Sequence, residues 1–141
     1  PPPETWAAWG PSPKGYKRYG YLALCISAAG VHARAVVKSE ADERAEMALR
    51  LRAKVGELER AFRGTRVAQY RTWDFVRMPR PEPATHEVFE ALARAVEKKT
   101  GGIDLGFGWP VADALRLDRA ELLDAFMELE PLYRIFRSVV P

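Results

Sequence analysis

The sequence predicts an α+β fold, with a mostly antiparallel sheet of about five strands and three helices packed on it. The length of 141 residues is typical of a single domain over residues 1–141. Hydrophobic residues make up 48% and charged residues 29%, a mix that can build and solvate a core. Three strand-like segments precede the first helix, which favours antiparallel pairing over a doubly wound parallel sheet.

The first strands are expected before residue 39. Residues 4–9 are short and aromatic, and residues 19–27 and 31–38 are apolar runs. A turn at Ala28–Gly30 separates the two apolar runs, so they are expected to form a hairpin.

The clearest helix is predicted over residues 40–62. Ser39 followed by Asp42 fits a capping box, and Gly64 ends the periodic pattern. Apolar residues at spacings of three and four form one buried stripe, made of Met47, Leu51, Val55, Leu58 and Phe62.

The second half alternates between strands and helices. Residues 67–76 read as a strand, and residues 78–83 as a proline-rich connector. Thr85 is expected to cap a helix that ends near Lys99, before Gly101 and Gly102.

The last elements are a strand and a broken helix. Residues 103–109 are strand-like, and Asp118 with Glu121 forms a second capping box. Pro131 is expected to interrupt the helix that this box opens, leaving a final turn or two over residues 132–140.

Composition limits the classes of function. Cys25 is the only cysteine and the chain has two histidines, too few for a His/Cys zinc site, so we expect no metal and no cofactor. There is no phosphate-binding loop, dinucleotide fingerprint or nucleophile elbow. No apolar run is long enough to span a membrane, and no signal peptide is seen, which indicates a cytoplasmic protein without a membrane partner.

Residue usage and charge are uneven. Asn is absent and Gln69 is the only glutamine, which fits a thermophile or a GC-rich genome. Residues 1–39 carry five Lys or Arg against one Glu, whereas residues 101–141 carry four Arg against seven Asp or Glu. A mildly basic N-terminal half can attract phosphate-bearing partners.

The segment from Lys14 to Tyr19 is the strongest candidate for ligand binding. It follows a loop rich in Pro and Gly and interleaves cations with aromatic rings, namely Lys14, Tyr16, Lys17, Arg18 and Tyr19. Such a run can hold a phosphate and stack on a base. The alternative is a solvated loop whose tyrosines lean on the core.

Two further pairs are candidates. His32 and Arg34 lie two positions apart on one strand and so share a face; His32 can serve as a general base, a ligand or a hydrogen-bonded structural residue. Arg71 and Trp73 also share a strand face, as the wall of an anionic pocket or as a structural cation–π pair.

Several motifs resemble the YktB-like family of uncharacterised bacterial proteins. The first are Pro2-Pro3-Glu4-Thr5-Trp6 and Lys14-Gly15-Tyr16-Lys17, and the last is Leu129-Glu130-Pro131-Leu132-Tyr133-Arg134. The resemblance implies an α+β fold, and also an N-terminal segment, ahead of the Pro-Pro motif, that this chain lacks. It implies no established activity.

The leading functional hypothesis is a binding module for an anionic or phosphate-bearing small ligand held against the sheet. Trp6, Arg34, Arg71 and Trp73 are the expected wall residues, beside the segment from Lys14 to Tyr19. The alternative is a nucleic-acid-binding protein that uses the basic N-terminal half. A third hypothesis is an enzyme with His32 as its base; the oligomeric state is left open.

Overall fold

The computed structural model describes residues 4–11, 18–70 and 77–137 of the chain. Within these ranges it contains the following elements in chain order: β1 (Glu4–Trp9), β2 (Tyr21–Ser27), β3 (Gly30–Val37), α1 (Arg44–Ala61), β4 (Arg66–Gln69), β5 (Glu82–Pro83), α2 (His86–Glu97), β6 (Ile103–Pro110), α3 (Val111–Ala114) and α4 (Arg119–Arg137).

The strands form one six-stranded sheet in the order β1-β2-β3-β6-β4-β5, and every strand pairing found among the described residues is antiparallel. The expected hairpin is confirmed, because β2 and β3 pair from Tyr21 opposite Val36 to Ser27 opposite Gly30. The α+β class is therefore confirmed, with one strand and one helix more than predicted.

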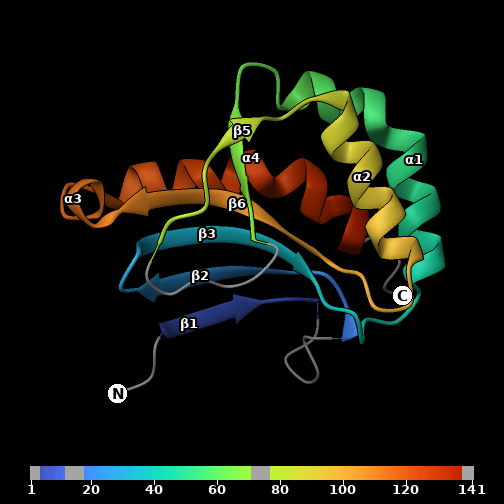
Figure 1. The fold of residues 1–141 in the computed structure, drawn as a ribbon, viewed down its shortest axis with the longest axis horizontal. Helices are drawn as coiled ribbons and strands as arrows, with labels where there is room; N and C mark the ends of the chain where they lie inside the picture. The colour runs from blue at the N-terminus through green and yellow to red at the C-terminus, as the bar shows by residue number, and fades with distance from the viewer. Residues whose placement is uncertain (1–3, 12–17, 71–76, 138–141) are drawn as a thin grey trace.

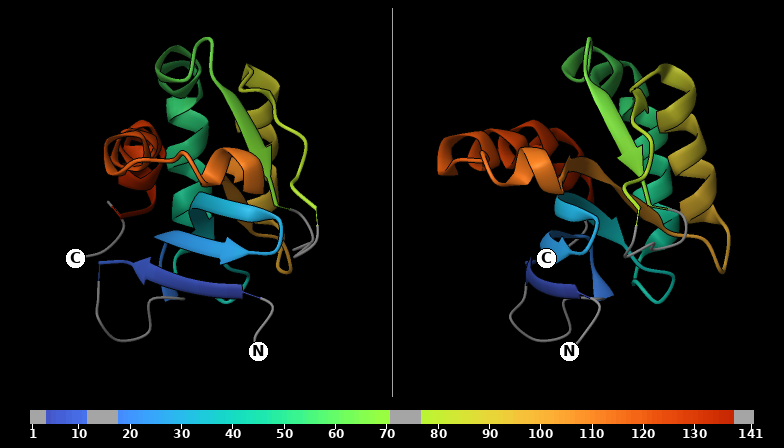
Figure 2. Two further views of the ribbon diagram at one scale, coloured as in Figure 1. Left: turned by 90° about the vertical axis from the view of Figure 1, so that its left-hand side faces the viewer. Right: turned by 60° about the vertical axis from the view of Figure 1, so that its left-hand side comes forward.

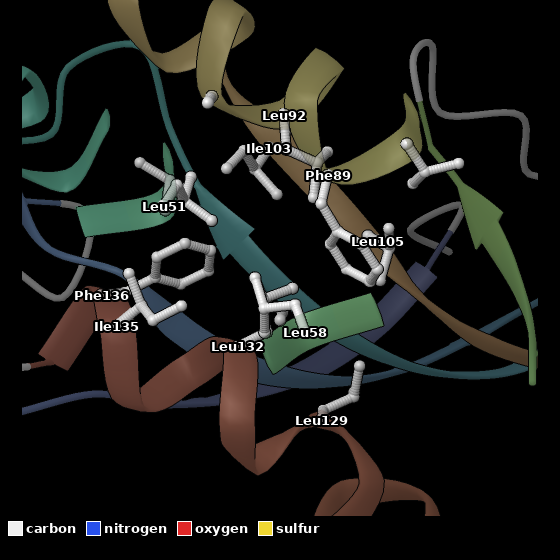
Figure 3. Close-up of a cluster of buried hydrophobic side chains, with 14 of the residues drawn as sticks. Leu51, Leu58, Phe89, Leu92, Ile103, Leu105, Leu129, Leu132, Ile135 and Phe136 are labelled. Atoms are coloured by element: carbon white, nitrogen blue, oxygen red, sulfur yellow. The ribbon is translucent and has the colours of Figure 1, made fainter. Parts of the chain in front are cut away.

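Helices α1, α2 and α4 pack on the same face of the sheet (Figures 1 and 2). Figure 3 shows their side chains converging on β6, with Leu51 and Leu58 from α1, Phe89 from α2 and Leu132 from α4. The predicted stripe of α1 is buried throughout: Met47, Leu51, Val55, Leu58 and Phe62.

The opposite face of the sheet carries no helix among the described elements, and we call it the helix-free face. In β3, Ala33, Ala35 and Val37 join the helix-covered core. Side chains alternate along a strand, so the intervening His32 and Arg34 lie on the helix-free face. The alternation of side chains along β3 therefore places both polar residues, His32 and Arg34, on the helix-free face.

The capping box predicted at Ser39 is wrong. Ser39 Oγ lies 3.3 Å from Glu40 Oε2, and the carboxylate of Asp42 accepts a hydrogen bond of 2.9 Å from Arg18. Helix α1 begins only at Arg44, after Glu43 with a left-handed φ of 56° and no side-chain cap bond. The carboxylate of Asp42, which the local pattern assigned to the cap, instead forms a tertiary contact with Arg18.

Two other predicted helix boundaries also need correction. Thr85 occupies the N-cap position of α2 but makes no side-chain cap bond, and α2 ends at Glu97 rather than near Lys99. Helix α4 continues through Pro131 instead of stopping there. Leu129 and Leu132 are both fully buried, so packing on either side of the proline compensates for its missing N–H.

The region after α1 differs most from the prediction. The expected strand over residues 67–76 is described only as β4, extended at Tyr70 by a 2.8 Å bond from its N–H to Asp104 O. Residues 71–76 lie outside the described ranges. The predicted connector contains β5, which pairs with β4 at Arg66 and Val67.

Candidate functional site

A buried ion pair lies at the centre of the helix-free face. Arg34 Nε donates to Asp104 Oδ1 at 2.7 Å, and Arg34 Nη2 donates to Asp104 Oδ2. The strand register makes this pairing possible, because Asp104 stands opposite Val36, two pairs along from Arg34 and therefore on the same face of the sheet. A bidentate pair of this kind satisfies the charge of an arginine that is only 7% exposed.

Two neighbours complete the surroundings of Arg34. Its Nη1 donates to the Sγ of Cys25 at 3.0 Å, and its Cζ lies 4.9 Å from the ring centroid of Tyr70. Burial alone would lower the pKa of Arg34, but the hydrogen bonds and charge of Asp104 outweigh it and raise that pKa. At Cys25, burial has the opposite effect: it raises the pKa of the thiol and so keeps the thiol protonated.

His32 is fully buried beside this pair. Its Nδ1 lies 2.9 Å from Tyr70 Oη, and its Nε2 lies 3.1 Å from Ser27 Oγ, which also accepts a 3.1 Å bond from the N–H of Ala29. Burial, assisted by the charge of Arg34, lowers the pKa of His32 to about 4. The imidazole is therefore neutral at pH 7, and with 0% exposure it has no access to a substrate in this conformation.

A small hollow opens on the helix-free face above Ala23. Its volume is about 100 Å³, and it is lined by Glu4, Trp6, Tyr21, Ala23, Cys25, Arg34 and Lys38. The Oε2 atom of Glu4 is buried there without a hydrogen-bond partner. Burial raises the pKa of Glu4, against the opposing effects of Arg34 and Lys38. We call this cavity the small hollow.

A second cavity, which we call the large hollow, lies where β3 ends, α2 ends and β6 begins. Its volume is about 590 Å³. Its described polar lining consists of Lys38, Ser39, Gln69, Tyr70, Arg94, Lys98, Thr100 and Asp104. Lys38, the residue that follows the end of β3, borders both hollows.

Arg44 binds the backbone of three residues that line the large hollow, namely Lys38, Lys98 and Gly101. Arg44 Nη1 donates to Lys38 O at 2.9 Å, and its Nη2 donates to Lys98 O at 2.5 Å and to Gly101 O. A Cβ at Gly102 would lie 2.5 Å from Val37 O, so only glycine allows this close approach. The loop after α2 is thereby held against both α1, to which Arg44 belongs, and β3.

The structure brings together only some of the residues predicted to form a site. Trp6 and Arg34 line the small hollow, whereas His32 lies beneath the same face with its ring nitrogens engaged by Ser27 and Tyr70. Tyr19 is half-buried outside both hollows. The other predicted site residues, Lys14, Tyr16, Lys17, Arg71 and Trp73, lie outside the described residues.

Sequence reasoning missed the cations of the large hollow and the partner of Arg34. Lys38, Arg94 and Lys98 come from a strand end and the last turns of a helix, and no sequence spacing links them. Asp104 carried one usable signal, because an acidic residue inside an apolar strand requires a buried partner.

The described residues contain neither a metal-binding cluster nor a membrane-spanning helix. No group of three or more His, Cys, Asp or Glu side chains there is arranged to hold a metal ion. No helix in these ranges is long and apolar enough to cross a membrane.

Comparison with known proteins gives a family and no activity. No curated protein matches the chain. The model of one family, described as a domain of unknown function (DUF1054), matches residues 1–133. This match covers most of the 141 residues, and the chain belongs to that family.

Proposed function

We propose that the protein binds a small anionic, phosphate-bearing ligand in the large hollow. The observation that supports this is the convergence of Lys38, Arg94 and Lys98 on one cavity. Among the described residues, none of the three makes an ion pair. Asp104 is the only described carboxylate of the lining, and it is already neutralised by Arg34.

The remaining lining suits such a ligand. The hydroxyls of Ser39 and Thr100 can donate to phosphate oxygens, and Leu92 and Ile103 give an apolar wall for the rest of the molecule. A volume of about 590 Å³ falls in the range of small-molecule sites.

Arg44 removes an electrostatic obstacle to this site. The carbonyl end of a helix carries a partial negative charge that repels anions. At the end of α2 the guanidinium of Arg44 binds the carbonyls of Lys98 and Gly101, beside the cavity wall. The net local charge therefore stays favourable for an anion.

The segment from Lys14 to Tyr19 and the pair Arg71 and Trp73 stay predictions for this ligand. Both groups lie outside the described residues, apart from Arg18 and Tyr19. Arg34, in contrast, is committed to Asp104, and we assign it a structural role.

The test is isothermal titration with inorganic pyrophosphate and with adenosine monophosphate, at about 50 and 200 mM salt. The variants Arg94→Gln and Lys98→Gln each remove one charge from the large hollow. We expect each to weaken binding about tenfold, corresponding to about 1.4 kcal/mol.

Lys99→Gln is the matched control, because Lys99 is an exposed neighbour of Lys98 outside the lining and carries the same charge. Equal weakening by all three variants, or no binding of either probe by the unaltered chain, would contradict the proposed site. Binding of a single-stranded oligonucleotide far more tightly than of the mononucleotide, with a steep loss at the higher salt, would favour nucleic-acid binding instead.

The origin of the protein is also a proposal. The motifs at Pro2–Trp6 and Leu129–Arg134 support the inference that the family is the YktB-like one and the source bacterial. The absence of Asn supports a thermophilic source, and a cytoplasmic location is the one we propose.

A further inference from the structure

The small hollow contains an acceptor and a donor that do not meet. Glu4 lines this cavity, and its Oε2 is buried without a hydrogen-bond partner. Lys38 borders the same cavity, and among the described residues its ammonium group makes no hydrogen bond or ion pair. A buried polar atom without a partner is unfavourable, so the cavity is best completed by something that donates to Glu4.

The other walls set the charge and shape of what fits between them. Arg34 contributes no net charge, because Asp104 pairs with it in bidentate geometry. Trp6 lies opposite Cys25 in the strand register and brings an indole ring to the lining, and Tyr21 brings a phenol ring. Such rings favour a cation near their faces.

The volume of the cavity, about 100 Å³, limits the size of its occupant. The lining includes Ala23, which supplies only a methyl group, and Trp6, whose side chain is 42% exposed. A molecule of a few heavy atoms fits, and one with a large side chain does not.

We propose that the small hollow is a second binding site, which takes a small zwitterion: an α-amino acid of the size of glycine or alanine. Its ammonium group donates to Glu4 Oε2 beside the ring of Trp6, and its carboxylate accepts from Lys38. A simple anion would face the carboxylate of Glu4, and a simple cation would face Lys38. A zwitterion satisfies both ends and keeps the cavity neutral.

The experiment is isothermal titration of the full chain with glycine and alanine, at pH 7. Acetate and methylammonium each carry one of the two charges, and leucine carries both with a larger side chain. We expect glycine and alanine to bind at least about tenfold more tightly than the other three. Equal binding of acetate or methylammonium would overturn the zwitterion.

The variant Glu4→Gln keeps the shape of the side chain and removes the charge that holds the ammonium group. We expect glycine binding to weaken about tenfold in Glu4→Gln and to stay within twofold in Arg94→Gln, which alters only the large hollow. Unchanged glycine affinity in Glu4→Gln, or no heat with any amino acid, would overturn the proposal and leave water as the occupant.

A second readout locates the ligand. The indole N–H signal of Trp6, assigned by its loss in Trp6→Phe, is expected to shift on addition of glycine and not on addition of pyrophosphate. The two proposals fail separately, because pyrophosphate binding is lost through Lys98→Gln and glycine binding through Glu4→Gln. Lys38→Gln is expected to weaken both ligands, since Lys38 borders both hollows.

Discussion

Polar side chains beneath the helix-free face are held in place by contacts with one another. Arg34 connects Asp104, Cys25 and the ring of Tyr70, and His32 lies edge-on to Tyr70, with ring centroids 5.5 Å apart. In a low-dielectric interior such a network is favourable only when its members are paired. This explains why two polar residues are tolerated in the middle of a strand that is otherwise buried.

The pKa values of the two histidines are expected to be shifted in opposite directions. Burial lowers the pKa of His32 to about 4, whereas the hydrogen bonds that His86 donates to Glu59 and Glu90 raise the pKa of His86 above its usual 6.5. Proton NMR of the imidazole signals resolves both groups, since the chain has only two histidines. Two signals that both titrate near 6.5 would contradict the buried environment of His32.

The shift of His32 also has a consequence for stability. Between pH 6.5 and 4 the unfolded chain binds a proton at His32 that the folded chain does not, so the contribution of His32 is complete above pH 6.5 and is lost as the pH falls. The loss approaches about 3 kcal/mol at pH 4. Urea unfolding at a series of pH values from 7 to 4 measures this loss. The free energy of unfolding is expected to fall less steeply with decreasing pH in His32→Gln than in the unaltered chain.

Among the helices, the two predicted capping boxes behave differently. Asp118 Oδ1 accepts a 2.8 Å bond from the N–H of Glu121 at the start of α4, so this cap is confirmed. Ser39, in contrast, lies five residues before Arg44, the first residue of α1. The same sequence pattern therefore caps a helix at Asp118 and caps none at Ser39.

Alanine substitution separates the two boxes. Asp118→Ala removes a bonded cap and is expected to lower the free energy of unfolding by about 1 kcal/mol. Ser39→Ala serves as its control and is expected to change the stability by no more than a few tenths of a kcal/mol, because Ser39 caps no helix. Urea unfolding at pH 7 measures both variants; a loss for Ser39→Ala as large as for Asp118→Ala would show that the box forms in solution.

Viewed as a whole, the sheet has protected central strands and one largely exposed edge strand. Strands β3 and β6 lie in the middle of the strand order and pair along their full length. Strand β1 lies at the edge, pairs only with β2 among the described strands, and exposes most of its residues. Local stability is expected to follow this order.

Amide hydrogen exchange tests that order. Peptides from β3, β6 and α1 are expected to exchange slowest, and those from β1 fastest among the strands, because an edge strand opens without disturbing the core. Exchange followed by mass spectrometry resolves these segments. Protection of β1 equal to that of β3 would indicate that the edge is covered in solution, for instance by a second copy of the chain.

Glycine, if it binds above β1, is expected to slow exchange in that strand, which links the proposed small site to the least protected element. The large hollow, by contrast, is bounded by β3, β6 and α2, all of which contribute to the buried core. Its shape is therefore expected to be largely formed before a ligand arrives.

Local sequence patterns were enough to predict the strands before α1, β6, the stripe of α1 and the α+β class, because alternation and the helical period are visible within a few residues. They were misleading where a distant group intervened. Asp42 binds Arg18 instead of capping α1. Helix α4 continues through Pro131, where Leu129 and Leu132 are buried on either side of the proline.

That His32 and Arg34 share a face follows from their spacing, because side chains alternate along a strand. The groups that meet them on that face come from the packing of distant segments. Asp104 reaches Arg34 from seventy positions away, and Lys38 and Lys98 meet at one cavity through the pairing of β3 with β6 and the docking of α2. Contacts between distant segments depend on register and packing, which no local pattern records.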